Sequence, residues 1–174
     1  MLENYKREIC ISISSNPGIF GETVHNAGYN YQGLNYLYKA IRIVNLEKTI
    51  EAIKLLHIRG CSVSMPFKEQ VVKYLDILDK DAKKAGAVNT ILNDNNTLKG
   101  YNTDISGASK ALQVININRK DSVLVVGAGG VARAIIIALQ KQKISDIFVT
   151  NRNLNKAKKL SKLFNCNLVY WEQR

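Results

Sequence analysis

The sequence predicts an α/β protein in which most strands lie parallel within two successive domains. Strand-like and helix-like patterns alternate along residues 8–65, and a hairpin pattern follows over residues 88–101. A glycine-rich loop then joins an apolar strand pattern to a helical one near residue 127. Alternation of strands with helices is typical of parallel sheets whose strands are connected by crossover helices.

The composition agrees with this fold class and excludes several kinds of partner. The chain has 174 residues, of which 46% are hydrophobic and 22% are charged, as in ordinary globular domains. No apolar run approaches the roughly 20 residues that span a bilayer, and the first ten residues do not resemble a signal peptide. We therefore expect a cytoplasmic protein, monomeric or homodimeric, without a membrane partner.

The net charge of +11 does not by itself indicate nucleic acid. The basic residues are scattered over every expected helix, and aromatic residues are not interleaved with them as stacking platforms. We therefore expect attraction for anionic small molecules and no nucleic-acid partner. Three cysteines cannot all pair, so we expect reduced thiols within strands, and two histidines without neighbouring ligands predict no metal site.

The first domain is expected to alternate strands and helices. The period of the apolar residues changes from two to about 3.6 and back along this part of the chain. Asn45 is positioned to cap the second helix. The expected elements are a strand at 8–14, a helix at 20–29, a strand at 35–40, a helix at 46–58 and a strand at 61–65.

Polar residues are expected at the ends of the following strands. Pro66 suits the first turn of a helix, so Lys68 should lie at a strand-to-helix junction facing a cleft. Short helices at 67–77 and 80–84 precede a hairpin with strands at 88–92 and 97–101. Asn89 begins one hairpin strand, and Asp104 follows the other. A lysine can deliver a proton, a carboxylate can orient that lysine, and amides can bind hydroxyls, as a polyol site requires.

The second domain begins after a helix at 105–114 and a polar connector at 116–120. A continuous buried strand at 123–126 leads into a helix ending near residue 139, and a second strand follows at 144–150. The loop between them has the G-x-G-x-x-G/A pattern of a dinucleotide-binding Rossmann fold, in which backbone N–H groups bind a pyrophosphate. The expected binding residues are Gly127, Ala128, Gly129, Gly130, Val131 and Ala132.

The end of the second strand indicates which dinucleotide is bound. An NAD site places an acidic residue there, whereas this chain has Asn151 and Arg152 and no acid. Arg152 can form a bidentate pair with a 2′-phosphate, and Lys156 can add a second cation. We therefore predict NADP.

Three ordered blocks resemble the shikimate dehydrogenase family: SVSMPFK at 62–68, GAVNT at 86–90 and GYNTD at 100–104. The resemblance covers nearly the whole chain. It implies reversible hydride transfer between NADP and shikimate, in aromatic amino acid biosynthesis through chorismate. By the same resemblance Lys68 and Asp104 are catalytic, and Asn89, Ser64 and Asp104 bind substrate hydroxyls. The substrate-binding domain then spans 1–104, and a partial Rossmann domain spans 105–174.

The carboxylate-binding region departs from the family pattern. The family has an S-x-S motif ahead of a His-Asn pair, and this chain has residues 19–21, Ile-Phe-Gly, at that place. Ser14 or Thr23 is the expected substitute, with Ser12 and Ser15 as alternatives. Losing a hydroxyl donor to a carboxylate costs about tenfold or more in affinity. The chain is therefore more similar to the shikimate dehydrogenase-like branch, and we expect weak turnover of shikimate or a related hydroxy acid as substrate.

The length of the chain is the second departure. The chain ends in what we expect to be the third strand of the dinucleotide-binding domain, so we expect a fragment or a truncated protein. A half sheet leaves its apolar edge at 123–126 poorly covered, and we expect less than normal turnover. Two alternatives stay open: a methylene-tetrahydrofolate-type dehydrogenase, and a protein that keeps the ligand site without turning over.

Overall fold

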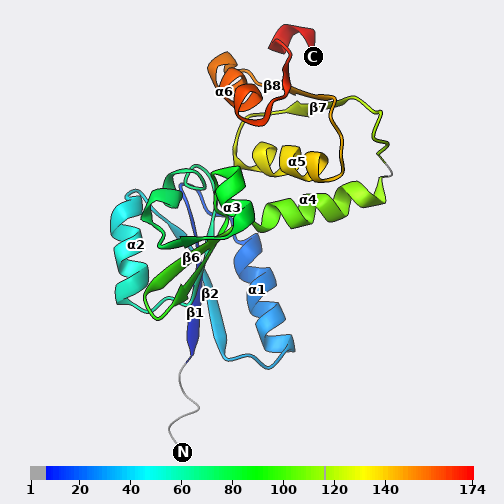
Figure 1. Ribbon diagram of the computed structural model, residues 1–174. Coiled ribbons are helices and arrows are strands. Elements are labelled where there is room, and N and C mark those ends of the chain that lie inside the picture. The colour runs from blue at the N-terminus through cyan, green and yellow to red at the C-terminus, as the bar shows by residue number, and fades with distance from the viewer. Residues whose placement is uncertain (1–6, 116) are drawn as a thin grey trace, which may run out of the picture. The chain divides into compact units, whose positions relative to one another are not determined.

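The computed structural model describes residues 7–115 and 117–174, and the chain divides into two compact units (Figure 1). The first unit is Met1–Tyr101 and the second is Asn102–Arg174. This division falls slightly ahead of the boundary expected at Asp104. The polar connector expected at 116–120 includes residue 116, which lies outside the described residues. In the described part of the chain, no helix has the length and apolar character needed to cross a membrane.

A six-stranded sheet in the order β2-β1-β3-β5-β6-β4 forms the first unit. Strands β1, β2 and β3 run parallel, as expected, while β5 pairs antiparallel with both β3 and β6, and β4 pairs parallel with β6. The carboxyl ends of β1 and β3 therefore lie side by side at the same end of the sheet. The strands are β1 Glu8–Ser14, β2 Tyr36–Arg42, β3 Gly60–Val63, β4 Ile77–Leu78, β5 Thr90–Asp94 and β6 Thr97–Tyr101.

Helices α1 (Phe20–Tyr31) and α2 (Leu46–Leu55) lie on opposite sides of strands β1 and β2 (Figure 1). Ile50 and Ile53 of α2 belong to the main core cluster with Ile11 and Ile13 of β1. The predicted cap of α2 is confirmed, since the Asn45 side chain accepts a hydrogen bond from the N–H of Lys48 at 3.0 Å.

Helix α2 ends earlier than the expected residue 58. His57 has a φ of 51°, in the left-handed region, and a helix of L-residues cannot continue through that conformation. Helix α1 extends two residues beyond the expected residue 29 and buries no residue. Its contacts with β2 combine aromatic packing, with the His25 ring stacked on Tyr38 at 4.3 Å between centroids, and hydrogen bonds.

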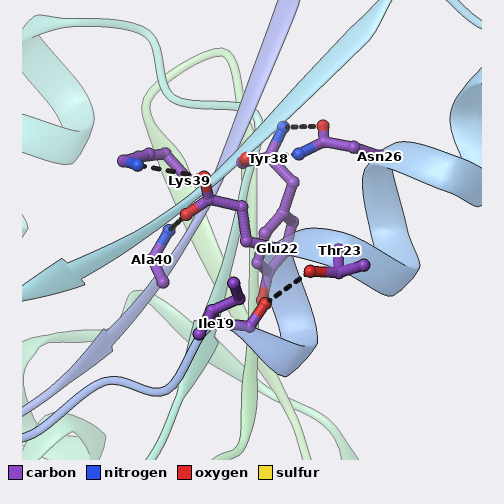
Figure 2. Close-up of polar contacts among 7 residues, drawn as sticks. All are labelled: Ile19, Glu22, Thr23, Asn26, Tyr38, Lys39 and Ala40. Atoms are coloured by element: carbon purple, nitrogen blue, oxygen red, sulfur yellow. Dashed lines mark hydrogen bonds and ion pairs between the residues drawn. The ribbon is translucent and has the colours of Figure 1, made fainter.

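Side chains of α1 bind the outer edge of β2, as Figure 2 shows. The Asn26 amide accepts from the N–H of Tyr38 and donates to the carbonyl oxygen of Tyr38, both at 2.9 Å. Glu22 accepts from the N–H of Ala40 at 3.1 Å and pairs with Lys39 at 2.9 Å. Since β2 is an edge strand, these side chains occupy main-chain groups that would otherwise be open to another strand.

The helix expected at 67–77 is wrong. A turn follows β3, closed by the N–H of Phe67, which donates to the carbonyl oxygen of Ser64 at 2.9 Å, and it contains a cis peptide bond before Pro66. A short 3₁₀ helix at Gln70–Tyr74 and the strand β4 replace the rest of the expected helix. The adjacent residues Val71 and Val72 have low helix propensity, and the segment is too short for them to be compensated. The helix expected at 80–84 is α3 (Lys80–Ala85).

The predicted hairpin is confirmed, with β5 beginning later than expected. Asn95 and Asn96 have φ values of 50° and 66°, and this pair of left-handed residues is typical of a two-residue type I′ turn. Asn89 therefore precedes β5 directly instead of beginning it. Asn102 follows β6 directly and leads to Asp104, which was expected after this strand.

The second unit contains a three-stranded parallel sheet in the order β7-β8-β9, with helices α5 and α6 between its strands. This β-α-β-α-β arrangement is that of one half of a Rossmann fold. Helix α4 packs against α5, and Gln142 donates from its amide to the carbonyl oxygen of Ser109 at 3.1 Å. The elements are α4 Thr103–Val114, β7 Val123–Val126, α5 Gly130–Lys141, β8 Ile147–Thr150, α6 Leu154–Phe164, β9 Asn167–Leu168 and a 3₁₀ turn at Trp171–Gln173.

The run at 123–126 is only partly buried, in agreement with the poor cover expected for a half sheet. Leu124 is 42% exposed and Val126 is 59% exposed, while Val125 is buried between them. Leu124 and Val126 project from the same face of β7, opposite to Val125, so it is this face that lacks cover. Among the cysteines, all of which are free thiols, Cys61 is buried in β3, but Cys166 is half-buried and precedes β9 rather than lying in a strand.

Candidate functional site

Main-chain hydrogen bonds place four predicted substrate-binding and catalytic residues in neighbouring segments of chain near the carboxyl ends of β1 and β3. The N–H of Ser64 donates to the carbonyl oxygen of Ile13, at 2.9 Å, which places Ser64 beside the end of β1 and thus beside Ser14. The N–H of Val63 donates to the carbonyl oxygen of Asn89, at 2.7 Å. Ser14, Ser64 and Asn89 are therefore linked across three neighbouring segments of chain.

Lys68 joins the same group through the chain that leads into β5. Its carbonyl oxygen accepts a hydrogen bond from the N–H of Val88 at 2.8 Å, so Lys68 lies next to the segment that carries Asn89. The N–H of Asn89 in turn donates to the carbonyl oxygen of Tyr101 at 3.0 Å, which ties this segment to the end of β6. The sheet thus brings together residues that are up to 75 positions apart, from Ser14 to Asn89.

The side chains of this group differ in their access to solvent. Lys68 and Asn89 are half-buried, and Ser64 is exposed. The amide oxygen of Asn89 accepts from the hydroxyl of Thr90 at 3.0 Å, which orients the amide. Such a set offers one ammonium donor, one oriented amide and hydroxyl groups, which is suited to a ligand that carries several hydroxyls.

Ser14 has the most unusual environment of the group. Its side chain is only 7% exposed, and no described residue gives its hydroxyl a hydrogen-bond partner. A buried hydroxyl without a partner costs about 1–3 kcal/mol, so such a group is usually satisfied by a ligand or a bound water. The hydroxyl of Ser14 therefore matches the need for a substitute carboxylate donor.

Thr23 has a different local role. It lies on α1, it is exposed, and its hydroxyl donates to the carbonyl oxygen of Ile19 at 3.1 Å (Figure 2). That bond is of the kind by which threonine pairs with the preceding helical turn. Its donor is thus already used within the helix.

Several residues of the two later sequence blocks have structural roles. Gly86 is the left-handed C-cap of α3, with a φ of 59°, and Ala87 and Val88 are fully buried. A Cβ atom at Gly100 would lie 2.5 Å from the Cδ1 atom of Leu75 and 2.9 Å from a methyl carbon of Val88. These blocks therefore combine packing residues with the polar side chains of the site.

Asp104 belongs to the second unit, whereas Lys68 belongs to the first. Asp104 is half-buried and lies in the first turn of α4. A carboxylate is stabilised there by the positive end of the helix dipole. In the sequence, Asp104 comes three residues after Tyr101, the last residue of β6.

The glycine-rich loop of the second unit has the features of a phosphate-binding loop. Gly127 follows β7 with a φ of 127°, a conformation that residues with a side chain rarely adopt. Gly129 is the N-cap of α5, where no side chain caps the helix. A Cβ atom built on Gly127 or Gly129 would meet nothing within 4 Å, so open space lies in front of both residues. The N–H groups at the start of α5 can therefore bind an anion, and the loop fits a dinucleotide pyrophosphate.

The end of β8 carries cations and no acidic residue. Arg152 and Lys156 are exposed on either side of the N-terminus of α6, whose positive dipole end also favours an anion. The amide of Asn151 donates to the carbonyl oxygen of Asn153 at 3.1 Å. Asn153, where the family pattern has threonine, caps α6 by accepting from the N–H of Lys156 at 3.1 Å.

Sequence reasoning missed one residue of this region. The side chain of Thr150 is fully buried, and its hydroxyl has no hydrogen-bond partner among the described residues. Its carbonyl oxygen accepts from the N–H of Gly127 at 2.8 Å, so Thr150 lies next to the glycine-rich loop. The available signal was a polar residue closing the apolar strand Ile147–Thr150 immediately before Asn151.

Two family profiles match the chain, one in each unit. The profile of the shikimate dehydrogenase substrate binding domain matches residues 13–91. The profile of shikimate / quinate 5-dehydrogenase matches residues 108–172. The first match contains Ser14, Ser64, Lys68 and Asn89, and the second contains the glycine-rich loop.

Individual relatives agree with these profiles. The chain is 37% identical over 161 residues to a shikimate dehydrogenase-like protein of Haemophilus influenzae, covering 92% of this chain and 59% of that protein. It is 38% identical over 152 residues to a shikimate dehydrogenase (NADP(+)) of Alkaliphilus oremlandii, covering 86% of this chain and 53% of the relative. A solved shikimate dehydrogenase in complex with NADP+ has a TM-score of 0.85 and 35% identity, over 97% of this chain and 63% of that one. The chain thus spans between about half and two thirds of the length of these relatives.

Proposed function

The chain belongs to the shikimate dehydrogenase family, and from this premise we propose that it binds shikimate, or a related cyclic hydroxy acid, together with NADP and interconverts the acid with its 3-dehydro ketone. The observation that carries the proposal is the placement of Ser14, Ser64, Lys68 and Asn89 in neighbouring segments near the carboxyl ends of β1 and β3. The first unit is then the substrate domain and the second the dinucleotide domain. Such a protein acts in the cytoplasm, in the chorismate pathway of aromatic amino acid biosynthesis.

Lys68 is the proton-transfer residue in this proposal. In the direction of reduction its ammonium protonates the carbonyl oxygen of the ketone, and in the reverse direction its amine takes the proton of the hydroxyl. Asp104 is proposed to orient Lys68 and to accept a hydrogen bond from a substrate hydroxyl. NADP, when bound, supplies or accepts the hydride.

Asn89 and Ser64 are proposed to bind ring hydroxyls. The amide of Asn89 has both a donor and an acceptor, so it can bind a hydroxyl in either sense, and Thr90 orients it. A pterin ring offers no comparable set of hydroxyls, which disfavours the methylene-tetrahydrofolate-type alternative.

Ser14 is proposed to bind the substrate carboxylate. Its hydroxyl is buried and lacks a described partner, whereas the hydroxyl of Thr23 is bonded within α1. A hydrogen bond to a charged acceptor contributes more than one to a neutral acceptor, about 1.5–3 kcal/mol. We therefore assign the carboxylate to Ser14 in preference to Thr23.

The second unit is proposed to bind NADP. Gly127, Gly129 and Gly130, with the intervening Ala128, bring the backbone N–H groups of the loop to the pyrophosphate, and Val131 and Ala132 continue the helix behind them. Arg152 binds the 2′-phosphate with Lys156 as a second cation, and Asn151 lies beside them. The absence of an acidic residue at the end of β8 supports NADP over NAD.

The test measures ligand binding and turnover separately on the 174-residue chain. Isothermal titration with shikimate and with NADP reports binding, and NADPH oxidation with 3-dehydroshikimate reports turnover. Lys68→Ala is expected to lower turnover by about 100-fold or more while shikimate still binds. Lys83→Ala, which removes an exposed lysine on α3, is the matched control and is expected to change neither quantity.

Each outcome bears on one part of the proposal. Equal turnover by the Lys68→Ala variant and the parent would contradict the proton role of Lys68. Equal affinity for NAD and NADP would contradict the role of Arg152. Binding of shikimate and NADP without turnover would favour the alternative of a ligand-binding protein, and this outcome is compatible with a chain that covers only part of its relatives.

A further inference from the structure

A groove in the first unit lies apart from the residues proposed to bind the substrate. It has a volume of about 400 Å³ and is formed by the end of β2, the connection between β2 and α2, and α2 itself. None of Ser14, Ser64, Lys68 and Asn89 lines it. The volume is within the range of about 300–1,000 Å³ that is typical of small-molecule sites.

The floor of the groove is apolar. Ile11, Ile43 and Ile53 line it, and all three are buried. The walls include Val44, which is 91% exposed, and Leu56, which is 64% exposed. A ligand with an aliphatic part would remove both the floor and these exposed walls from water, which is favourable in proportion to the apolar area covered.

The rim of the groove is cationic. Arg42 and Lys48 line it, and no aspartate or glutamate does. Both side chains are exposed, and neither has an ion-pair partner in the described part of the chain. The N-terminus of α2, capped by Asn45, lies in the same lining and adds the positive end of a helix dipole.

We propose that this groove binds a small amphipathic monoanion, an aliphatic carboxylate whose tail covers the isoleucine floor and whose carboxylate faces Arg42 and Lys48. A neutral apolar ligand would leave the two cations unused, and a highly charged ligand such as a sugar phosphate would leave the apolar floor bare. Charge complementarity and apolar area therefore favour the same class of ligand. Binding here does not require the reaction proposed above.

Octanoate is the probe for the test, with butanoate and hexanoate as shorter homologues and 1-octanol as the uncharged control. Each acid is titrated into the ¹⁵N-labelled full chain, and backbone amide shifts are recorded. Saturable shifts are expected at residues 42–49, and affinity is expected to increase about fourfold for each added methylene. Octanol is expected to bind several times more weakly than octanoate, because it makes no charged contact with the rim.

Variants separate the two parts of the site. Arg42→Gln and Lys48→Gln are each expected to weaken octanoate about two- to fivefold and to leave octanol unchanged. Ala52→Leu, which fills the groove from α2, is expected to abolish the shifts, and Lys158→Gln on α6 is the matched charge control without effect.

Three results would overturn the proposal. One is the absence of saturable shifts at residues 42–49. Another is equal binding of octanol and octanoate, since the rim would then contribute nothing. The third is an affinity that does not depend on chain length, since the floor would then not be covered by the tail.

Discussion

The two units of the chain differ at their edge strands β2 and β7. In the first unit, Asn26 and Glu22 of α1 occupy the outward-facing main-chain groups of β2 at Tyr38 and Ala40. In the second unit, β7 is an edge strand whose Leu124 and Val126 side chains are exposed. An open edge invites pairing with another strand, so a sheet needs either a covering element or side chains that occupy its edge. For the edge strand β2, the side chains of α1 fill this role.

The two candidate sites also differ, in whether side chains or backbone groups form them. The site of the first unit consists of side chains that long-range main-chain hydrogen bonds bring together, as with Ser64 and Asn89. The site of the second unit consists mainly of backbone, at Gly127, Gly129 and the start of α5, with charges added by Arg152. Substitutions in the first unit are therefore expected to change stability more strongly than those in the second. Substitutions in the second unit are expected to act mainly on ligand binding.

The largest difference is expected between a buried and an exposed aliphatic residue. Ile53, which is 1% exposed, packs in the core of the first unit, and Ile53→Ala should lower the free energy of unfolding by about 2–5 kcal/mol. Leu124→Ala on the edge of the second unit should cost less than about 1 kcal/mol, because Leu124 is 42% exposed. Amide hydrogen exchange measured separately in each unit checks both values, and equal losses would contradict the contrast.

Substitutions of two glycines, one in each unit, are expected to have smaller but contrasting effects. Gly100→Ala places a Cβ atom 2.5 Å from Leu75 and should cost about 1–3 kcal/mol of unfolding free energy in the first unit. Gly129→Ala meets no atom within 4 Å, so stability should change by less than about 0.5 kcal/mol. NADP affinity should fall instead, because the added methyl group enters the space proposed for the pyrophosphate. Urea unfolding and NADP titration distinguish the two variants, and a reversed pattern would refute this division of roles.

Removing the amide that occupies the β2 edge should have an intermediate effect. Asn26→Ala breaks two hydrogen bonds to Tyr38 and should cost about 1–2 kcal/mol. It should also promote self-association, because the edge of β2 becomes open to another strand. Asn30→Ala, an exposed residue of the same helix, is the control. Size-exclusion chromatography and urea unfolding measure the two effects; a monomeric Asn26→Ala variant of unchanged stability would argue against edge protection.

Acid should weaken the same contact by a smaller amount. The Lys39 ammonium and then the N–H of Ala40 hold the pKa of Glu22 below its usual value. A carboxyl group whose pKa is lower in the folded state stabilises the fold above its unfolded pKa, about 4.3, and loses this contribution as the pH falls through the folded pKa. Between pH 6 and pH 3 the parent should therefore lose more stability than Glu22→Gln. Parallel unfolding curves of the two proteins across that range would show that Glu22 contributes nothing.

The local features of the chain were predictable from short stretches of sequence. Asn45 caps α2, Asn95 and Asn96 form the predicted turn, and Gly127 follows β7 before a helix, as expected. Each of these depends on the intrinsic conformational preference of one or two residues and on partners within a few positions. The three sequence blocks likewise identified the family, which the comparisons confirm.

Other features were not predictable because they depend on distant neighbours. The segment after Pro66 has apolar residues at helical spacing, yet β4 pairs with β6, more than 20 positions later, and replaces the end of the expected helix. The run at 123–126 was expected to be poorly covered, but the sequence did not indicate that Val125 would be buried while Leu124 and Val126 are exposed. Periodicity reports which residues prefer to be buried and does not report whether an element is present to bury them.

By itself, the sequence determined most of the order of strands and helices, the phosphate-binding type of loop and the residue types available to each site, because these follow from local preference and from motif spacing; the segment at 67–78 is the exception. Only the tertiary structure decided that the Ser14 hydroxyl is buried without a described partner, that Asn26 occupies the edge of β2 and that Gly100 has no room for a side chain. These properties belong to pairs of residues far apart in the chain, and they exist only once the sheet has brought the pairs within hydrogen-bonding or van der Waals distance.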